Sequence, residues 1–170
     1  RGLYVTLIGH FLPSEDPKGA FVFLEKTGDG FKPPKTLLKD LPRATHVEFA
    51  DFNKDGKMDF VLSIFGNNLG RLGWFENTGP DAYREHIILP KPGALRTVVR
   101  DFNNDGSPDI AVLMAQESEA FFMLLNDGKG NFEPLTIFQK APSFGHSHFE
   151  MADFDGDGRL DILAVNGDNG

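Results

Sequence analysis

The sequence has 170 residues, of which 40% are hydrophobic and 25% charged, and it contains no cysteine. This composition is typical of about one soluble globular domain, and it excludes a disulfide framework, thiolate chemistry and a membrane-spanning run of about 18 apolar residues. The formal net charge is −8 and the sequence has no basic stripe, so a nucleic-acid partner is not expected.

The chain begins with an apolar, strand-like run at Leu3–Gly9, which matches Phe60–Gly66 at a constant offset of 57 residues. The polar stretch Pro13–Gly19 follows, and we expect an exposed loop there. Phe21–Phe31 then reads as an apolar run that ends in a glycine-containing turn, which is a pattern typical of a β-hairpin. Residues 1–43 are therefore expected to hold strands two to four of an incomplete four-stranded unit.

A nine-residue pattern, D-F-[ND]-x-D-G-x-x-D, occurs three times, at Asp51–Asp59 (loop one), Asp101–Asp109 (loop two) and Asp153–Asp161 (loop three). The oxygen side chains at positions 1, 3, 5 and 9 can converge on one point if the loop curls, and glycine at position 6 permits the sharp turn. A backbone carbonyl at position 7 would complete a set of hard oxygen ligands that suits Ca²⁺. An EF-hand is excluded because no copy has glutamate at position 12.

The alternative is that each loop is merely a turn held by Asx hydrogen bonds, since Asn, Asp and Gly dominate turns. Three copies at steps of 50 and 52 residues, each with aspartate at position 9, favour the metal loop. The distribution of charge also favours the metal loop. The loops hold ten of the 25 acidic residues, which leaves 15 acidic against 17 basic residues elsewhere. The acidity is therefore concentrated in the three loops.

Each loop leads into an apolar run, and a period near 50 residues is typical of a solenoid or a propeller. The first full unit predicts strands at about 45–50, 58–65, 71–76 and 84–89, and four short antiparallel strands are typical of a propeller blade. We predict an all-β fold of about three to three and a half blades. A closed propeller has about 4–8 blades, so we expect a piece of a larger propeller or closure by self-association. The expected units are an incomplete blade at 1–43, blades at 44–93 and 94–143, and strands one and two of a blade at 144–170.

The loops, together with the downstream segments W-F-E-N-T-G and L-L-N-D-G-K-G-N-F, resemble the FG-GAP/VCBS repeats of integrin α-chain head propellers and of many secreted bacterial proteins. The resemblance covers roughly residues 2–170, although the first unit lacks its loop. It implies Ca²⁺ between the first two strands of a blade, at about three sites. The implied ligands are the side chains of Asp51, Asn53, Asp55, Asp59, Asp101, Asn103, Asp105, Asp109, Asp153, Asp155, Asp157 and Asp161 and the carbonyls of Lys57, Ser107 and Arg159.

The expected role of Ca²⁺ is structural, because several carboxylates in one loop repel each other without a cation. A bridging role, in which Ca²⁺ also holds a ligand, is the alternative. Extracellular modules bind Ca²⁺ at about 10⁻⁴–10⁻³ M, which suits an extracellular, periplasmic or cell-surface location. We therefore expect a secreted module that binds a protein or a glycan, as in cell adhesion or carbohydrate binding.

A second candidate site comes from residues that stand five positions before the loops. His46, Arg96 and His148 occupy this position, and each would begin the innermost strand of a blade at the mouth of a central funnel. Such a ring could hold a metal, a carboxylate or a sugar acid, as in a polysaccharide lyase or a sugar dehydratase. The plainer interpretation is a set of polar residues that cap a solvated channel. The candidate funnel residues are His46, Arg96, His146 and His148, with Glu48 and Glu150 two residues further in.

Other enzyme chemistry has little support. The sequence has no G-x-S-x-G motif and no cysteine, so nucleophilic catalysis is not expected. Trp74 occupies a position that is Phe or Met in the other units, so we expect it in the blade core instead of on a sugar platform. An enzyme is thus less favoured than a binding module, and a purely architectural spacer is a third, weaker option.

Overall fold

The computed structural model describes residues 1–11, 14, 16–66, 68–116, 119–141 and 145–166. Over these ranges the chain forms thirteen β-strands in four antiparallel sheets, and they contain no helix. Accordingly, none of the described residues forms a helix that could cross a bilayer. The all-β prediction is confirmed. Parts of the predicted loop at 13–19 lie outside the described residues, as do residues 142–144 near the expected boundary between the third and fourth units.

The sheets contain three, four, four and two strands, and within each sheet the strands follow chain order. The first sheet consists of β1 (Gly2–Leu7), β2 (Gly19–Glu25) and β3 (Lys35–Leu41). The second consists of β4 (Ala44–Ala50), β5 (Asp59–Ile64), β6 (Arg71–Gly79) and β7 (Ala82–Leu89). The third consists of β8 (Ala94–Arg100), β9 (Asp109–Met114), β10 (Glu119–Asn126) and β11 (Phe132–Lys140), and the fourth of β12 (His146–Ala152) and β13 (Asp161–Asn166).

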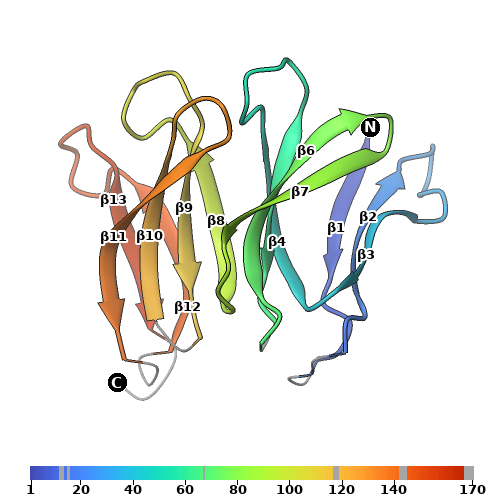
Figure 1. Cartoon of the computed structure of the whole chain (residues 1–170), viewed down its shortest axis with the longest axis horizontal. Helices are drawn as coiled ribbons and strands as arrows, with labels where there is room; N and C mark the ends of the chain where they lie inside the picture. Colours follow the sequence, from blue (N-terminus) through green and yellow to red (C-terminus); the bar gives the residue numbers. More distant parts are fainter. Residues whose placement is uncertain (12–13, 15, 67, 117–118, 142–144, 167–170) are drawn as a thin grey trace.

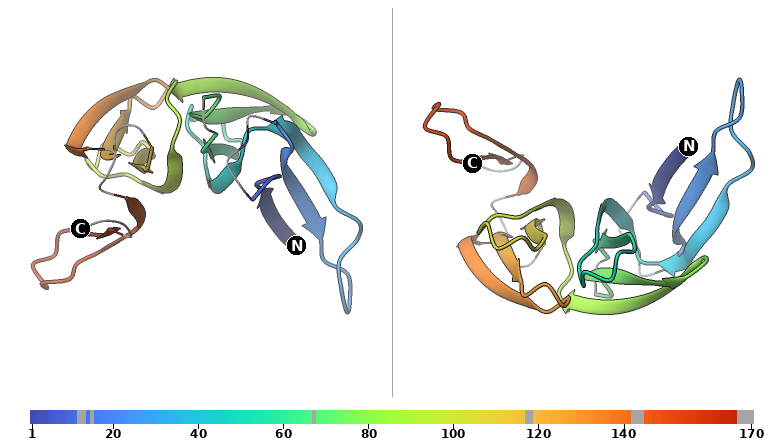
Figure 2. Two further views of the ribbon diagram at one scale, coloured as in Figure 1. Left: turned by 90° about the horizontal axis from the view of Figure 1, so that it is seen from below. Right: turned by 90° about the horizontal axis from the view of Figure 1, so that it is seen from above.

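The four sheets stand side by side (Figure 1). Seen along the strands, they form an arc in which β4 and β8 lie on the concave side and β7 and β11 on the convex side (Figure 2). The strand order within each sheet therefore runs from the inside of the arc to the outside, as in the blades of a propeller. The predicted propeller-like architecture is confirmed, and the described residues do not close into a ring.

The core lies between neighbouring sheets. β5 and β9 are buried along their whole length, because each is a central strand of a sheet packed between two others. Alternate residues of β5 face opposite neighbours: Phe60, Leu62 and Ile64 pack toward the first sheet, and Val61 packs toward the third. Trp74 is buried in the core between the second and third sheets, as the sequence predicted.

Candidate metal loops and the inner-face cluster

The three loops have the same local structure, and they lie in three successive sheets at the same end of the strands. Each joins the first strand of a sheet to the second, and Figure 1 shows the three connections on one side. In loop one the two carboxylate oxygens of Asp51 accept the amides of Asp55 at 3.0 Å and Gly56 at 2.8 Å. Asp101 and Asp153 accept the corresponding amides at 2.8–3.1 Å. The aspartate at position 1 therefore curls each loop around itself.

Positions 4 and 6 turn the backbone through the left-handed region. In loop one φ is +58° at Lys54 and +82° at Gly56, and loop two has +60° at Asn104 and +81° at Gly106. A non-glycine residue adopts such values at a cost, which the hydrogen bonds to positions 1 and 3 offset. Loop three avoids this cost at position 4, where it has Gly156.

The closing aspartates of loops one and two are fully buried. One oxygen of Asp59 accepts the Phe52 amide at 3.2 Å, and the other accepts the Asn77 amide at 2.8 Å. Asp109 likewise accepts the amides of Phe102 at 2.9 Å and Asn126 at 2.8 Å. Burial raises the pKa of Asp59 above its ordinary value, against the opposing effect of its two amide donors. A bound cation would favour the charged form of this buried carboxylate.

The aspartate at position 5 already has a polar partner in each loop. Lys57 Nζ lies 2.8 Å from Asp55 in loop one, and Arg159 Nε lies 2.8 Å from Asp157 in loop three. In loop two Asn103 donates its side-chain amide to Asp105 at 2.8 Å. These side-chain hydrogen bonds are the largest cause of the lowered pKa of each position-5 carboxyl.

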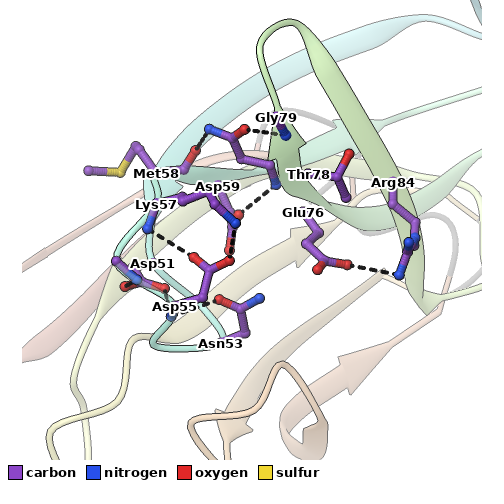
Figure 3. Close-up of polar contacts among 12 residues, drawn as sticks. Asp51, Asn53, Asp55, Lys57, Met58, Asp59, Glu76, Thr78, Gly79 and Arg84 are labelled. Carbon is purple, nitrogen blue, oxygen red and sulfur yellow. Dashed lines mark hydrogen bonds and ion pairs between the residues drawn. The ribbon is translucent and has the colours of Figure 1, made fainter.

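Figure 3 shows the polar side chains of loop one gathered along the inside of the turn, with Lys57 reaching to Asp55. In loop three, one oxygen each from Asp153, Asp155 and Asp161 lie within 4.8 Å of one another. This is the one group of three potential metal-ligating His, Cys, Asp or Glu side chains found among the described residues. Its donors are all hard oxygens, and the loop already has the required curl, so the residues present fit Ca²⁺.

The candidate funnel residues lie near the start of the concave strands, and we call His46, Arg96, His148 and the glutamates Glu48 and Glu150 the inner-face cluster. Its members bridge neighbouring sheets. His46 Nδ1 lies 3.1 Å from the Thr97 hydroxyl in the third sheet. Arg96 donates to the Phe149 carbonyl at 3.0 Å and to Glu150 at 2.9 Å in the fourth. His148 Nε2 also lies 2.9 Å from Glu150.

The electrostatics of the inner-face cluster follow from burial and from its positive groups. Burial, together with the smaller effect of the positive charges of Arg96 and His148, lowers the pKa of His46 to about 4, so this imidazole is neutral near pH 7. Burial also raises the pKa of the Glu48 carboxyl, whereas hydrogen bonding by His148, supported by Arg96, lowers that of Glu150.

The cluster residues are not arranged as ligands of one metal. Among the described residues, no group of three His or Glu side chains at these positions has its ligand atoms within 4.8 Å. Instead, His46 and Arg96 each contact a residue of the following sheet, and His148 contacts a residue of its own strand. The side chain of His146 lies outside the part of the chain that the structure describes.

Sequence reasoning missed two residues that organise the loops, Asn77 and Asn126. Asn77 lies two residues before the end of β6, and Asn126 is the last residue of β10. Each donates its backbone amide to the closing aspartate. A signal was present, because both asparagines stand in the repeated segments W-F-E-N-T-G and L-L-N-D-G-K-G-N-F, 18 and 17 residues after Asp59 and Asp109. The recurrence of asparagine at a nearly constant distance from the closing aspartate could have shown that this residue belongs with the loop.

Comparison with known proteins agrees with the repeated geometry. The model of the FG-GAP-like repeat family matches residues 101–164, which span loop two, β9 to β12, loop three and the first residues of β13. A comparison with curated proteins found no match. The resemblance noted in the sequence is therefore confirmed over residues 101–164, which contain an FG-GAP-like repeat.

Proposed function

We propose that this chain is a Ca²⁺-stabilised, propeller-type module of an extracellular protein, and that it binds a protein or a glycan. The three loops hold one ion each. Residues 1–43, 44–93, 94–143 and 144–170 act as successive blades or partial blades, and the loops lie at one rim of the arc. The ligands in each loop are the side chains at positions 1, 3, 5 and 9 and the carbonyl at position 7.

One observation carries this proposal: the same hydrogen-bonded curl, lined with oxygen side chains, occurs in all three loops. A turn held by Asx bonds alone would need the aspartate at position 1 but not the one at position 9. The closing aspartates are nevertheless present in every copy, and two of them are buried. Burying a carboxylate costs free energy unless it is paired, and a cation in the loop supplies the pairing.

The role of the ion is structural. In loops one and two the closing aspartate is bonded to its own loop and to the third strand of its sheet. A cation that draws this carboxylate toward positions 1 to 5 would fix the loop against the second and third strands. Protein or carbohydrate binding then falls to surfaces that the ion holds in place, and millimolar extracellular Ca²⁺ would keep the loops occupied.

A thermal melt in millimolar Ca²⁺, repeated with excess chelator and with Mg²⁺, tests the proposal. An ion that binds the folded state alone stabilises it, by about 2.7 kcal/mol per site at 100 times the dissociation constant. We expect a higher melting temperature with Ca²⁺ and a much smaller effect of Mg²⁺, which requires tighter octahedral geometry.

The matched variants are Asp105→Asn and Asp157→Asn, which remove one exposed ligand charge from loop two and loop three. Each variant should reduce the rise in melting temperature that Ca²⁺ causes. The melting temperature measured in chelator should change by much less. Equal melting temperatures with Ca²⁺ and with chelator would contradict the proposal and leave the loops as turns.

A carbohydrate-active enzyme remains the second candidate, and the neutral His46 beside Glu48 is the observation that favours it. An imidazole that is neutral near pH 7 can accept a proton, and a carboxyl with a raised pKa can hold one. The double variant His46→Gln, Glu48→Gln should abolish cleavage of an acidic polysaccharide if this candidate is correct. Native chain that leaves such polysaccharides intact would exclude a lyase.

A further inference from the structure

Asn126 lies between two of the proposed calcium loops and contacts both. Its side chain is 2% exposed, and its Nδ2 donates to the Phe52 carbonyl of loop one at 2.9 Å and to the Pro108 carbonyl of loop two at 3.0 Å. Its backbone amide donates to Asp109, the closing residue of loop two, at 2.8 Å. One residue of the third sheet therefore holds the backbone of both loops.

The orientation of this side chain is fixed by its other contacts. Asn126 Oδ1 accepts the amides of Gly128 at 3.1 Å and Gly130 at 3.2 Å, so the turn that follows β10 folds around it. The turn is also seated on the second sheet, since a Cβ on Gly130 would lie 2.4 Å from Trp74 Cζ2. Both ends of the amide are satisfied, which leaves it little freedom to rotate.

Two further contacts join loop one to the third sheet. The ring of Phe52, at position 2 of loop one, lies 5.7 Å from that of Phe132 in β11. A Cβ on Gly128 would lie 3.0 Å from both Lys54 Nζ and Ser107 Oγ, so the position-4 lysine of loop one reaches the edge of loop two. The contact between the loops is thus broader than one hydrogen bond.

Asn77 provides an internal comparison, because it occupies the same place in the preceding sheet. Its backbone amide donates to Asp59 at 2.8 Å, its Nδ2 donates to the Met58 carbonyl at 3.2 Å, and its Oδ1 accepts the Gly79 amide at 3.2 Å. Each of these partners belongs to loop one or to the second sheet itself. Asn77 therefore positions one loop, whereas Asn126 positions two.

We propose that Asn126 couples loop one to loop two, so that Ca²⁺ binding at these two loops is positively cooperative. Loop three, with which Asn126 makes none of its hydrogen bonds, binds its ion independently. This inference rests on the proposed function. Ca²⁺ in loop two would hold Asp109 in place, so the hydrogen bond from the Asn126 backbone amide to Asp109 would open less often. The Phe52 carbonyl, directly after the first ligand of loop one, is then already held, so loop one loses less conformational entropy when it binds its ion. Linkage makes the effect reciprocal.

A Ca²⁺ titration followed by ¹H–¹⁵N NMR resolves the three loops separately. The amides of Gly56, Gly106 and Gly158 each donate to the aspartate at position 1 of their own loop, so each reports the occupancy of that loop. In the native chain, Gly56 and Gly106 should titrate together and more steeply than a single-site curve. Gly158 should follow a single-site curve.

The decisive variants are Asn126→Ala and Asn77→Ala. Asn126→Ala should weaken Ca²⁺ binding at both Gly56 and Gly106 by about fivefold or more and leave the Gly158 curve unchanged. Asn77→Ala should weaken binding at Gly56, with a smaller change at Gly106 that is transmitted through the coupling. The unchanged Gly158 curve separates a positioning effect from a general loss of stability.

Asp105→Asn keeps the test valid if Asn126→Ala does not fold. This variant weakens Ca²⁺ binding at loop two while Asn126 stays in place, so the midpoint of the Gly56 titration should move to a higher Ca²⁺ concentration. Asp157→Asn, in loop three, should leave that midpoint unchanged. Overlapping Gly56 curves in native chain and Asp105→Asn would overturn the coupling and leave the calcium proposal standing. Glycine amides that do not respond to Ca²⁺ in any loop would overturn both.

Discussion

Loops one and three share one sequence pattern and one curl but differ in what covers them. Phe52, at position 2 of loop one, is fully buried between Trp74 and Phe132, whereas Phe154 at the same position of loop three is 55% exposed. The difference comes from the neighbouring sheet, because the third sheet packs over loop one through β11. The nine residues thus determine the shape of the loop, and the adjoining sheet determines its burial.

The same contrast applies to the concave strands. His46 and His148 both stand five residues before a loop, but 25% of the His46 side chain is exposed against 46% for His148. His46 contacts Thr97 in the following sheet, and His148 contacts Glu150 on its own strand. Residues at equivalent positions of the repeat therefore have different environments. Comparing the same single substitution at two equivalent positions separates the effect of the loop itself from the effect of the neighbouring sheet.

The largest difference is expected for the phenylalanines at position 2. Phe52→Ala removes a fully buried ring from the interface between the second and third sheets, which should lower the free energy of unfolding by about 3–5 kcal/mol. Phe154→Ala removes an exposed ring and should change it by less than about 0.5 kcal/mol. Urea denaturation in chelator measures both. Similar losses of unfolding free energy for the two variants would mean that the ring stabilises its own loop and not the contact with the neighbouring sheet.

The next largest difference is expected for the closing aspartates. Asp109 has a buried amide donor at each oxygen, so Asp109→Asn turns an NH₂ group toward one of them and should cost about 1–3 kcal/mol. For Asp161, the described residues provide one donor, Phe154, to which an asparagine oxygen can still turn. Asp161→Asn should therefore cost less than about 1 kcal/mol in chelator. A reversed order in chemical denaturation would contradict the burial argument.

The outline of this architecture was predictable because it depends on local pattern. The run Phe60–Phe65 and the loop before it predicted the strand that the structure places at Asp59–Ile64. The burial of Trp74 followed from comparing the units with one another. Such features need only the alternation of side chains in strands and the turn preferences of Asp, Asn and Gly.

The contacts between sheets were not predictable from the sequence. The bond from Asn126 to the Phe52 carbonyl joins residues 74 positions apart, and that from His46 to Thr97 joins residues 51 apart. Their geometry depends on how two sheets pack, which no repeat period specifies. The period did place His46, Arg96 and His148 on the same side of the arc, but it could not show that His46 would contact Thr97 while Arg96 and His148 share Glu150.

A smaller difference is expected from pH. The folded chain holds the pKa of His46 near 4, below its ordinary value of 6.5, so it binds this proton less tightly than the unfolded chain does. The corresponding stability is present above about pH 6.5 and is lost as the pH falls toward 4. Between pH 7 and 5, His46→Gln should reduce the loss of unfolding free energy by about 1 kcal/mol, allowing for partial exposure of the ring. Equal slopes of unfolding free energy against pH, measured in chelator for native chain and for His46→Gln, would contradict this role of His46.

The smallest difference is expected from the cation at position 7. Lys57 in loop one pairs with Asp55, and Arg159 in loop three pairs with Asp157, whereas loop two has Ser107 at this position. Exposed pairs of this kind contribute little to stability, and each must yield its carboxylate to an incoming ion. Lys57→Gln and Arg159→Gln should therefore each tighten Ca²⁺ binding at their own loop by less than about fivefold, more at low salt than at high salt. Calorimetric titration at two salt concentrations measures this, with Ser107→Ala as the control in the loop that has no cation to displace. Unchanged affinity at low salt would mean that the position-7 side chain moves away before the ion arrives.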